Sequence, residues 1–455
     1  MRPTPILPVL AALTAAVPAQ WVQANPNQSP SLRRAGAMAF DGATNRLLLY
    51  GGVSPTPSTI LAETWSFNGQ WQQLAQAAGL PRWGHQMVRN PNTNRVLTFG
   101  GRSPTISGLA NDTYEWTGST WVAVPTPTAP SPRFLYGMAY DQNRTVFVLF
   151  GGRTLAGANA ETWEFDGLSW TQRTTANAPA PREEFVMFYD TSLNRTVLFG
   201  GCDEGTNTVF GDTWFYDGID WTNVTPTQSP SPRFRCAYAF DSVRRRGVVY
   251  GGFDGTQIRT ETFEFTGDQW LEISTGSLVP PNATEAYAGF DPVRRRFVVF
   301  GGFGGTFSNA TWEYQGATGG VFGTFGDPCA TSAGVPTIAS STPTIGQTLQ
   351  FTVDNAPASA EGVLFVLGLS NLTWLGVPLP FPLGIVGLSG CDLLVSADVI
   401  EIALTSGGSA TFGLPIPNQT SLISQSIFVQ GIVADLLPGF TLLGATRGGR
   451  ALLGN

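Results

Sequence analysis

Three charged residues occupy equivalent positions in three successive stretches of about 50 residues: Glu184, Arg235 and Glu285. Two carboxylates beside a guanidinium could bind or enolise a sugar acid, because the arginine would anchor the ligand's carboxylate while one glutamate moves a proton. The same three charges could instead form a solvated triplet at the mouth of a wet channel, since charged side chains are seldom buried without partners. We favour this second, structural interpretation.

Another set of charges follows the pattern of a structural support. Five repeats have an arginine eight residues before the acid or amide that ends their first apolar run, and an acid at the start of their third run. The arginines are Arg33, Arg82, Arg133, Arg182 and Arg233, and the acids are Glu63, Asp112, Glu161, Asp212 and Glu261. The sixth repeat has alanine at both places, Ala283 and Ala310. Because arginine and acid are lost together, we predict five Arg–carboxylate bridges rather than five ligand sites.

The residues needed for several other chemistries are missing from the sequence. The chain has no lysine, which excludes a lysine nucleophile or Schiff base. Its only histidine, His85, is the only residue that could serve in a Ser-His-Asp triad, and we interpret it as a packed structural side chain. No Walker, Rossmann, zinc-ligand or EF-hand pattern occurs. We therefore predict no metal and no cofactor.

Four cysteines and the N-terminal segment indicate an exported protein. Residues 1–19 have a basic start at Arg2, an apolar run and small residues near the end, which is typical of a signal peptide. No later apolar stretch is long enough to cross a membrane. In a secreted or extracytoplasmic protein, at the cell surface or in the periplasm, disulfides persist. We predict two, Cys202–Cys236 on one face of neighbouring repeats and Cys329–Cys391 in a second domain.

A repeat of about 50 residues must position these side chains. Six Gly-Gly pairs begin at Gly51, Gly100, Gly151, Gly200, Gly251 and Gly301, and six tryptophans keep step with them, Trp21, Trp71, Trp121, Trp170, Trp221 and Trp270. Each repeat contains four short apolar runs bounded by Gly, Pro, Asn or Asp, which predicts four strands. Four-stranded units of this period pack around an axis. Since Trp21 precedes the first Gly-Gly, we predict that residues 21–24 complete the sixth sheet by pairing near Trp312.

The repeat resembles the kelch family of β-propellers over about residues 21–314, and is most similar to exported bacterial versions. The resemblance rests on the double glycine, on paired aromatics such as Trp163 and Trp170, and on the Pro-Arg-x-Gly-His sequence that ends at His85. It implies a six-bladed propeller with the first strand of each repeat innermost. Six-bladed kelch sialic-acid mutarotases give the Glu184, Arg235 and Glu285 triplet its enzymatic alternative. The single histidine excludes copper chemistry like that of galactose oxidase.

Residues 326–455 follow a different pattern of short alternating runs, which predicts a small C-terminal β-sandwich. This part is similar to an uncharacterised module of exported bacterial repeat proteins. We thus expect an all-β chain with a signal peptide at 1–19, a six-bladed propeller at 21–320 and a sandwich at 326–455. The net charge of −7 argues against a nucleic-acid partner. Irregular loops favour a secreted, non-catalytic scaffold that binds an extracellular glycan or protein, with a sugar-acid-modifying enzyme as the alternative. The sequence indicates no oligomeric state.

Overall fold

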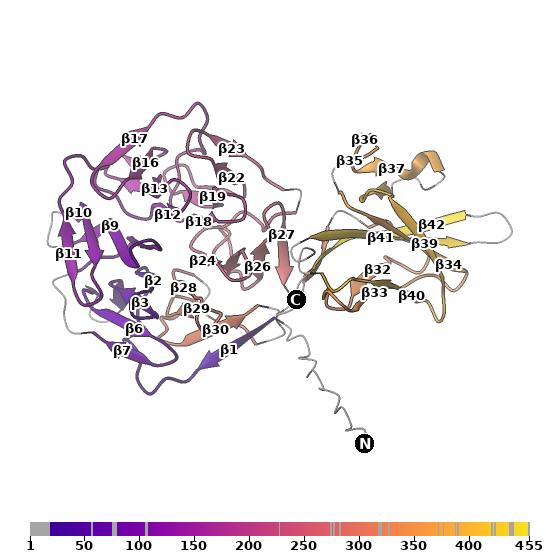
Figure 1. Cartoon of the computed structure of the whole chain (residues 1–455), viewed down its shortest axis with the longest axis horizontal. Coiled ribbons are helices and arrows are strands. Elements are labelled where there is room, and N and C mark those ends of the chain that lie inside the picture. Colours follow the sequence, from indigo (N-terminus) through magenta and orange to yellow (C-terminus); the bar gives the residue numbers. More distant parts are fainter. Residues whose placement is uncertain are drawn as a thin grey trace, which may run out of the picture. The chain divides into compact units, whose positions relative to one another are not determined.

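The computed structural model describes residues 19–453, apart from residues 56–57, 75–79, 105–107, 227, 274, 276–277, 282–283, 317–320, 326–327, 372, 376, 387, 389–390, 420–421, 423–424 and 436–440. The predicted signal peptide lies outside the described residues except for Ala19, and Ala283 also lies outside them. The chain divides into two compact units (Figure 1). One is Gln20–Gly316, and the other lies within residues 317–455.

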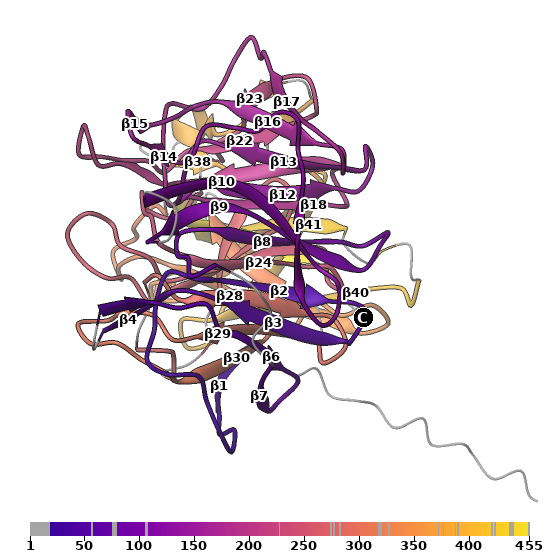
Figure 2. The ribbon, with the colours of Figure 1, turned by 90° about the vertical axis from the view of Figure 1, so that its left-hand side faces the viewer.

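The described part of the first unit contains six four-stranded antiparallel sheets. The first strands are β2 (Ala37–Asp41), β8 (Gln86–Asn90), β12 (Gly137–Asp141), β18 (Val186–Asp190), β24 (Ala237–Asp241) and β28 (Tyr287–Asp291). The second strands are β3 (Arg46–Tyr50), β9 (Arg95–Ser103), β13 (Val146–Phe150), β19 (Arg195–Phe199), β25 (Arg246–Tyr250) and β29 (Arg296–Phe300). Each first strand lies beside the first strands of the preceding and following sheets, and β28 lies beside β2 (Figures 1 and 2). The repeated sheets therefore have a propeller-like arrangement.

The third and fourth strands of the six sheets recur at the spacing of the sequence repeat. The third strands are β6 (Thr64–Phe67), β10 (Gly108–Trp116), β16 (Thr162–Phe165), β22 (Thr213–Tyr216), β26 (Thr262–Phe265) and β30 (Thr311–Gln315). The fourth are β7 (Trp71–Gln73), β11 (Trp121–Val124), β17 (Trp170–Arg173), β23 (Trp221–Asn223), β27 (Trp270–Ile273) and β1 (Gln20–Ala24). Strand β1 pairs antiparallel with β30, and Gln23 lies opposite Trp312. This is the pairing that the phase offset of Trp21 predicts.

The fourth-strand tryptophans join neighbouring sheets. Each donates its indole Nε1–H to the hydroxyl of a threonine in the third strand of the preceding sheet, over 2.8–3.1 Å. The pairs are Trp21–Thr262, Trp71–Thr311, Trp121–Thr64, Trp170–Thr113, Trp221–Thr162 and Trp270–Thr213. All six tryptophans are almost fully buried. A buried indole N–H needs such a partner, so the repeated threonine satisfies the repeated tryptophan.

The Gly-Gly pairs let two sheets approach through their main chains. Gly51 and Gly52 have φ values of 69° and 99°, a region that favours glycine. A Cβ on Gly51 would lie 2.4 Å from the carbonyl oxygen of Arg82 in the next sheet. The N–H of Gly52 donates to that same oxygen over 2.8 Å.

Short hairpins follow three of the Gly-Gly pairs: β4 (Val53–Pro55) with β5 (Ser58–Ile60), β14 (Arg153–Thr154) with β15 (Gly157–Ala158), and β20 (Cys202–Asp203) with β21 (Thr208–Val209).

The second unit has a five-stranded and a three-stranded sheet among its described residues. The larger has the order β31 (Val321–Phe325), β42 (Thr441–Leu452), β41 (Ser426–Asp435), β34 (Gly362–Gly368), β39 (Val399–Leu404). The smaller has the order β32 (Thr337–Ser340), β33 (Thr348–Asp354), β40 (Ala410–Pro415). One apolar cluster contains side chains of both sheets, including Phe351, Phe365 and Val429. Short elements complete the unit: β35 (Thr373–Trp374), β36 (Val377–Pro378), β37 (Phe381–Pro382), the 3₁₀ helix η1 (Leu383–Val386) and β38 (Asp392–Leu393).

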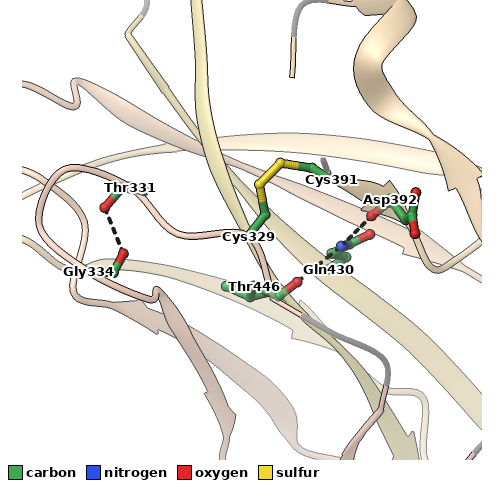
Figure 3. Close-up of a disulfide and its surroundings, with 7 residues drawn as sticks. All are labelled: Cys329, Thr331, Gly334, Cys391, Asp392, Gln430 and Thr446. Atoms are coloured by element: carbon green, nitrogen blue, oxygen red, sulfur yellow. Dashed lines mark hydrogen bonds between the residues drawn. A yellow bond between two sulfur atoms is a disulfide. The ribbon is translucent and has the colours of Figure 1, made fainter. Parts of the chain in front are cut away.

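A disulfide joins Cys329 to Cys391 in the second unit, with their Cα atoms 5.3 Å apart, as predicted (Figure 3). Beside it, the Gln430 side chain donates to the carbonyl oxygens of Asp392 and Thr446 over 3.0 Å each. The bridge thus ties the segment before β32 to the start of β38, which lies 62 residues further along the chain.

Candidate functional site

Six residues that precede the first strands form a closed ring, here called the mouth ring. Each main-chain N–H donates to the carbonyl oxygen of its counterpart in the preceding sheet, over 2.6–3.1 Å. In ring order they are Ala35, Gly84, Leu135, Glu184, Arg235 and Glu285, and the Ala35 N–H donates to Glu285. All six have φ values between 52° and 66°. The ring places three charged residues that are about 50 positions apart in sequence next to one another.

The Arg235 side chain joins the two predicted glutamates. Its Nε lies 2.9 and 2.8 Å from the two carboxylate oxygens of Glu184 and 3.2 Å from Oε1 of Glu285. Its Nη2 contacts Oε1 of Glu204 at 3.1 Å. Glu204 lies between β20 and β21, and nothing in the repeat pattern indicated it. The guanidinium therefore faces three carboxylates at once.

Further ion pairs extend this group into a network that we call the mouth cluster. Arg34 Nη1 contacts Oε2 of Glu285 at 2.8 Å. Arg153 Nη1 contacts Oε1 of Glu183 at 2.7 Å and Oε2 of Glu204 at 3.1 Å. The mouth cluster comprises three arginines and four glutamates: Arg34, Arg153, Arg235, Glu183, Glu184, Glu204 and Glu285. Its acids outnumber its arginines by one.

Burial gives Glu184 an ionisation that differs from that of an ordinary carboxyl group. Its side chain is 5% exposed. Burial raises the pKa of Glu184 to about 7, although Arg235 acts in the opposite direction. Burial also raises the pKa of Glu183. The carboxylates around Arg235 outweigh its burial and raise its pKa further above the ordinary value. Near neutral pH, Glu184 can therefore both give and accept a proton.

A cavity of about 320 Å³ opens inside the mouth ring and is lined by all six of its residues. It continues along the first strands, past Met38, Met87 and Met138, to aromatic side chains that include Phe40 and Tyr140. This volume is at the lower end of the range for small-molecule sites. The cavity therefore suits a small ligand or the end of a longer one.

The residues just before the mouth ring form its rim, and they differ from sheet to sheet. Trp83 forms a main-chain bridge with Arg102, the residue that follows Gly101. Trp83 is half-buried and packs edge-on against Phe134, with ring centroids 5.2 Å apart. The exposed Arg102 guanidinium lies 5.9 Å from the centre of the Trp83 ring. Within the described parts of the chain, Arg102 has no carboxylate within ion-pair distance.

The five predicted bridges are all in contact, and they lie outside this site. Their closest N–O distances are 2.5 Å for Arg33–Glu63, 3.0 Å for Arg82–Asp112, 2.5 Å for Arg133–Glu161, 2.6 Å for Arg182–Asp212 and 3.2 Å for Arg233–Glu261. The arginine side chains are at most 2% exposed. Four of them also donate to the carbonyl oxygen of the first glycine of a Gly-Gly pair, as Arg133 does to Gly151 over 3.1 Å. These contacts support the structural interpretation.

The predicted Cys202–Cys236 disulfide is wrong, because both thiols are free. Cys202 pairs with Glu183 in its own sheet, and its thiol donates to Oε2 of Glu184 over 3.7 Å. Cys236 follows Arg235 of the mouth ring, and its thiol donates to the Gly251 carbonyl over 3.6 Å. The two cysteines belong to different sheets, and each side chain is held by its own surroundings. Burial raises the pKa of both thiols, so neither is a ready nucleophile.

His85 is a packed side chain. It is 1% exposed, and its ring lies 5.2 Å from the Tyr50 ring, centroid to centroid. Burial, with a smaller contribution from Arg82, holds its pKa well below the ordinary value. A neutral, enclosed imidazole fits the structural interpretation better than a catalytic one.

The comparisons with known proteins leave the family open. No protein-family model matches the chain, and no curated protein matches it. Among the residues that the structure describes, no group of three or more His, Cys, Asp or Glu side chains is placed to hold a metal ion. In the same residues, no helix has the length and apolar character needed to cross a membrane.

Proposed function

We propose that residues 20–316 form a six-bladed kelch-type propeller completed by β1, and that residues 321–453 form a β-sandwich. The arrangement of the first strands, the β1–β30 pairing and the six Trp–Thr bonds between neighbouring sheets support the first proposal. The apolar cluster shared by the two sheets of the second unit supports the second. The Cys329–Cys391 bridge is consistent with export, because disulfides persist in oxidising compartments.

We propose that the protein is a secreted, non-catalytic scaffold that binds an extracellular glycan or protein. One observation carries this proposal: a group of charges that does not recur from sheet to sheet, distinct from the repeated Arg–carboxylate bridges, lies at the mouth ring, whose residues line a cavity. Repeated contacts maintain the fold, and side chains that vary at one position of a rigid scaffold are the usual place of binding.

A glycan array probed with the purified full-length exported protein tests this function, with a parallel screen against immobilised extracellular proteins. We expect selective binding in one of the two screens, at physiological salt and with the disulfide intact. Uniform failure to bind in both screens would refute the proposed scaffold function.

The alternative is a sugar-acid-modifying enzyme similar to a mutarotase. The raised pKa of Glu184 favours it, because a group that ionises near pH 7 suits proton transfer. The three carboxylates around Arg235 oppose it, because a ligand carboxylate would have to displace one of them. An NMR assay of anomer exchange on sialic acid distinguishes the two. We expect no acceleration by the wild-type protein over buffer, and a rate above buffer that Glu184→Gln abolishes would favour the enzyme.

A further inference from the structure

The mouth ring keeps a backbone conformation that its residue types do not favour. Five of its six residues are not glycine, although all six φ values are positive. In this region each L-residue other than glycine costs about 1–2 kcal/mol, and glycine is the ordinary choice. The fold accepts glycine there, since Gly84 holds this place in one sheet. The side chains of Leu135, Glu184, Arg235 and Glu285 are therefore not explained by the backbone they occupy.

The rim residue Trp83 also has no equivalent tryptophan in the other repeats. Ten of the other eleven tryptophans of residues 20–316 recur at equivalent positions, in the third strand or at the start of the fourth. The eleventh, Trp116, ends the third strand of its sheet, where the other sheets have Phe or Tyr. Trp83 does not recur, because the equivalent residues in the other sheets are Arg34, Phe134, Glu183, Phe234 and Thr284. Trp83 is half-buried and directly precedes Gly84, which lines the cavity, whereas Trp83 itself is on the rim and not in the cavity wall.

From these observations we propose that the mouth ring binds the terminal unit of a neutral glycan, with Trp83 against one face of the sugar ring and the Glu184–Arg235–Glu285 group bonded to its hydroxyls. This inference rests on the proposed scaffold function and narrows its ligand to one class. It places the site at the end of the cavity that the mouth ring surrounds, rather than on the irregular loops.

The charges favour a neutral ligand over a charged one. Arg235 already faces Glu184, Glu204 and Glu285, so an incoming carboxylate would meet three like charges. At the rim, the exposed Arg102 lies beside Trp83, has no acid partner among the described residues and would oppose a cation bound there. A sugar hydroxyl is uncharged, so neither the carboxylates nor Arg102 repels it. It can donate to a carboxylate oxygen and accept from a guanidinium N–H at the same time.

The shape of the site favours a sugar over a protein segment. The cavity of about 320 Å³ is at the lower end for small-molecule sites, whereas a protein partner would bury about 800 Å² of surface on each side. A pyranose ring has an apolar face of C–H groups, and tryptophan offers a large rigid surface with a polar edge to cover it. The aromatic face and the hydroxyl-binding groups therefore suit opposite parts of one sugar unit.

Ligand-observed NMR titration of the full-length protein tests the proposal, with the methyl glycosides of glucose, galactose and mannose as neutral probes and N-acetylneuraminic acid as the charged probe. We expect at least one neutral glycoside to bind with a dissociation constant on the order of 1 mM, the value that ordinary ligand efficiency gives a molecule of this size. Trp83→Ala should weaken this binding about tenfold, which corresponds to about 1.4 kcal/mol. Trp83→Phe, which keeps an aromatic face, should retain most of it.

Two further variants separate the site from general effects on folding. Glu184→Gln keeps the shape of the side chain and should also weaken binding of the neutral glycoside. Glu115→Gln serves as the matched control, because Glu115 pairs with Arg95 at the opposite end of its sheet, and it should leave binding unchanged. Thermal unfolding of each variant, followed by tryptophan fluorescence, shows whether the fold is kept.

Each contrary outcome overturns the inference in a distinguishable way. Tighter binding of N-acetylneuraminic acid than of every neutral glycoside would assign the site to a sugar acid. Neutral glycosides that bind equally well to wild type, Trp83→Ala and Glu184→Gln would place the glycan site elsewhere and leave the scaffold function standing. No binding of any monosaccharide, together with a protein ligand found by screening, would replace the glycan by a protein. If both screens also fail, the scaffold function fails with the inference.

Discussion

Replacing Glu184 by glutamine should change how the stability of the first unit depends on pH. The substitution keeps the size of the side chain and removes its charge. In the folded protein, burial raises the pKa of Glu184 from its ordinary value of 4.5 to about 7. Between these two values the folded chain holds a proton that the unfolded chain has lost. Stability must therefore depend on pH across this window.

The sign and the size follow from the two pKa values. Because the folded-state pKa is raised, the contribution is complete below about pH 4.5 and is lost as the pH rises through about 7. At 1.36 kcal/mol per pKa unit, the difference corresponds to about 3 kcal/mol. Glutamine cannot ionise, so the Glu184→Gln variant lacks this loss. Relative to the variant, the wild type should lose about 3 kcal/mol of unfolding free energy between about pH 4 and pH 8.

Urea unfolding at a series of pH values measures this difference. Tryptophan fluorescence reports on the first unit, since every tryptophan except Trp374 lies in residues 20–316. Glu161→Gln is the matched control. Burial alone would raise the pKa of Glu161, but hydrogen bonds from Arg133 and Trp163 lower it below the ordinary value. The stability of the wild type relative to Glu161→Gln should therefore increase as the pH rises. A pH-independent gap for Glu184→Gln, or one with the sign of Glu161→Gln, would refute the reasoning about burial at the mouth ring.

Three other results are expected. Arg133→Ala should cost about 3 kcal/mol in urea unfolding, because it breaks a bridge with a fully buried guanidinium, and should leave glycan binding intact; lost binding at unchanged stability would contradict its structural role. Trp21→Phe and Trp121→Phe should each cost about 2 kcal/mol, since each leaves a buried threonine hydroxyl without its indole donor; a far smaller loss at Trp21 would mean that β1 does not complete the sixth sheet. Alkylation of the denatured protein without reductant should label two thiols, and reduction should expose the two of Cys329–Cys391; four labelled thiols before reduction would disprove the bridge.

The sequence predicted contacts well where the chain repeats them. The Arg–carboxylate bridges could be found because five repeats keep both partners and the sixth has lost both, so one chain supplies its own comparison. The pairing of β1 with β30 could be found because the tryptophan and glycine series are out of phase. In both cases one local pattern recurs several times, and the packing it reflects is the same in every sheet.

The sequence predicted less where partners come from unlike segments. Arg34 and Glu285 are in contact, but they lie at opposite ends of the repeat array and meet only because β28 lies beside β2. Glu204 reaches Arg235 from a hairpin that has no equivalent in every repeat. The prediction of a Cys202–Cys236 disulfide failed for a related reason. A shared face of neighbouring sheets does not fix where two side chains point, and each thiol donates to an acceptor other than its predicted partner.

Repetition distinguishes the residues that maintain the fold from those to which we assign the proposed binding. A residue that recurs in five or six sheets meets the same neighbours each time, so its role is set by the fold, as for Trp170 with Thr113 or Arg133 with Glu161. The mouth ring is the opposite case. Its residues share one main-chain hydrogen bond and a positive φ in all six sheets, while their side chains range from methyl to carboxylate to guanidinium. Because this backbone also accepts glycine, its conformation does not specify which side chain stands at each place. All six residues of the ring line the cavity that they surround, which is why we place the proposed ligand there.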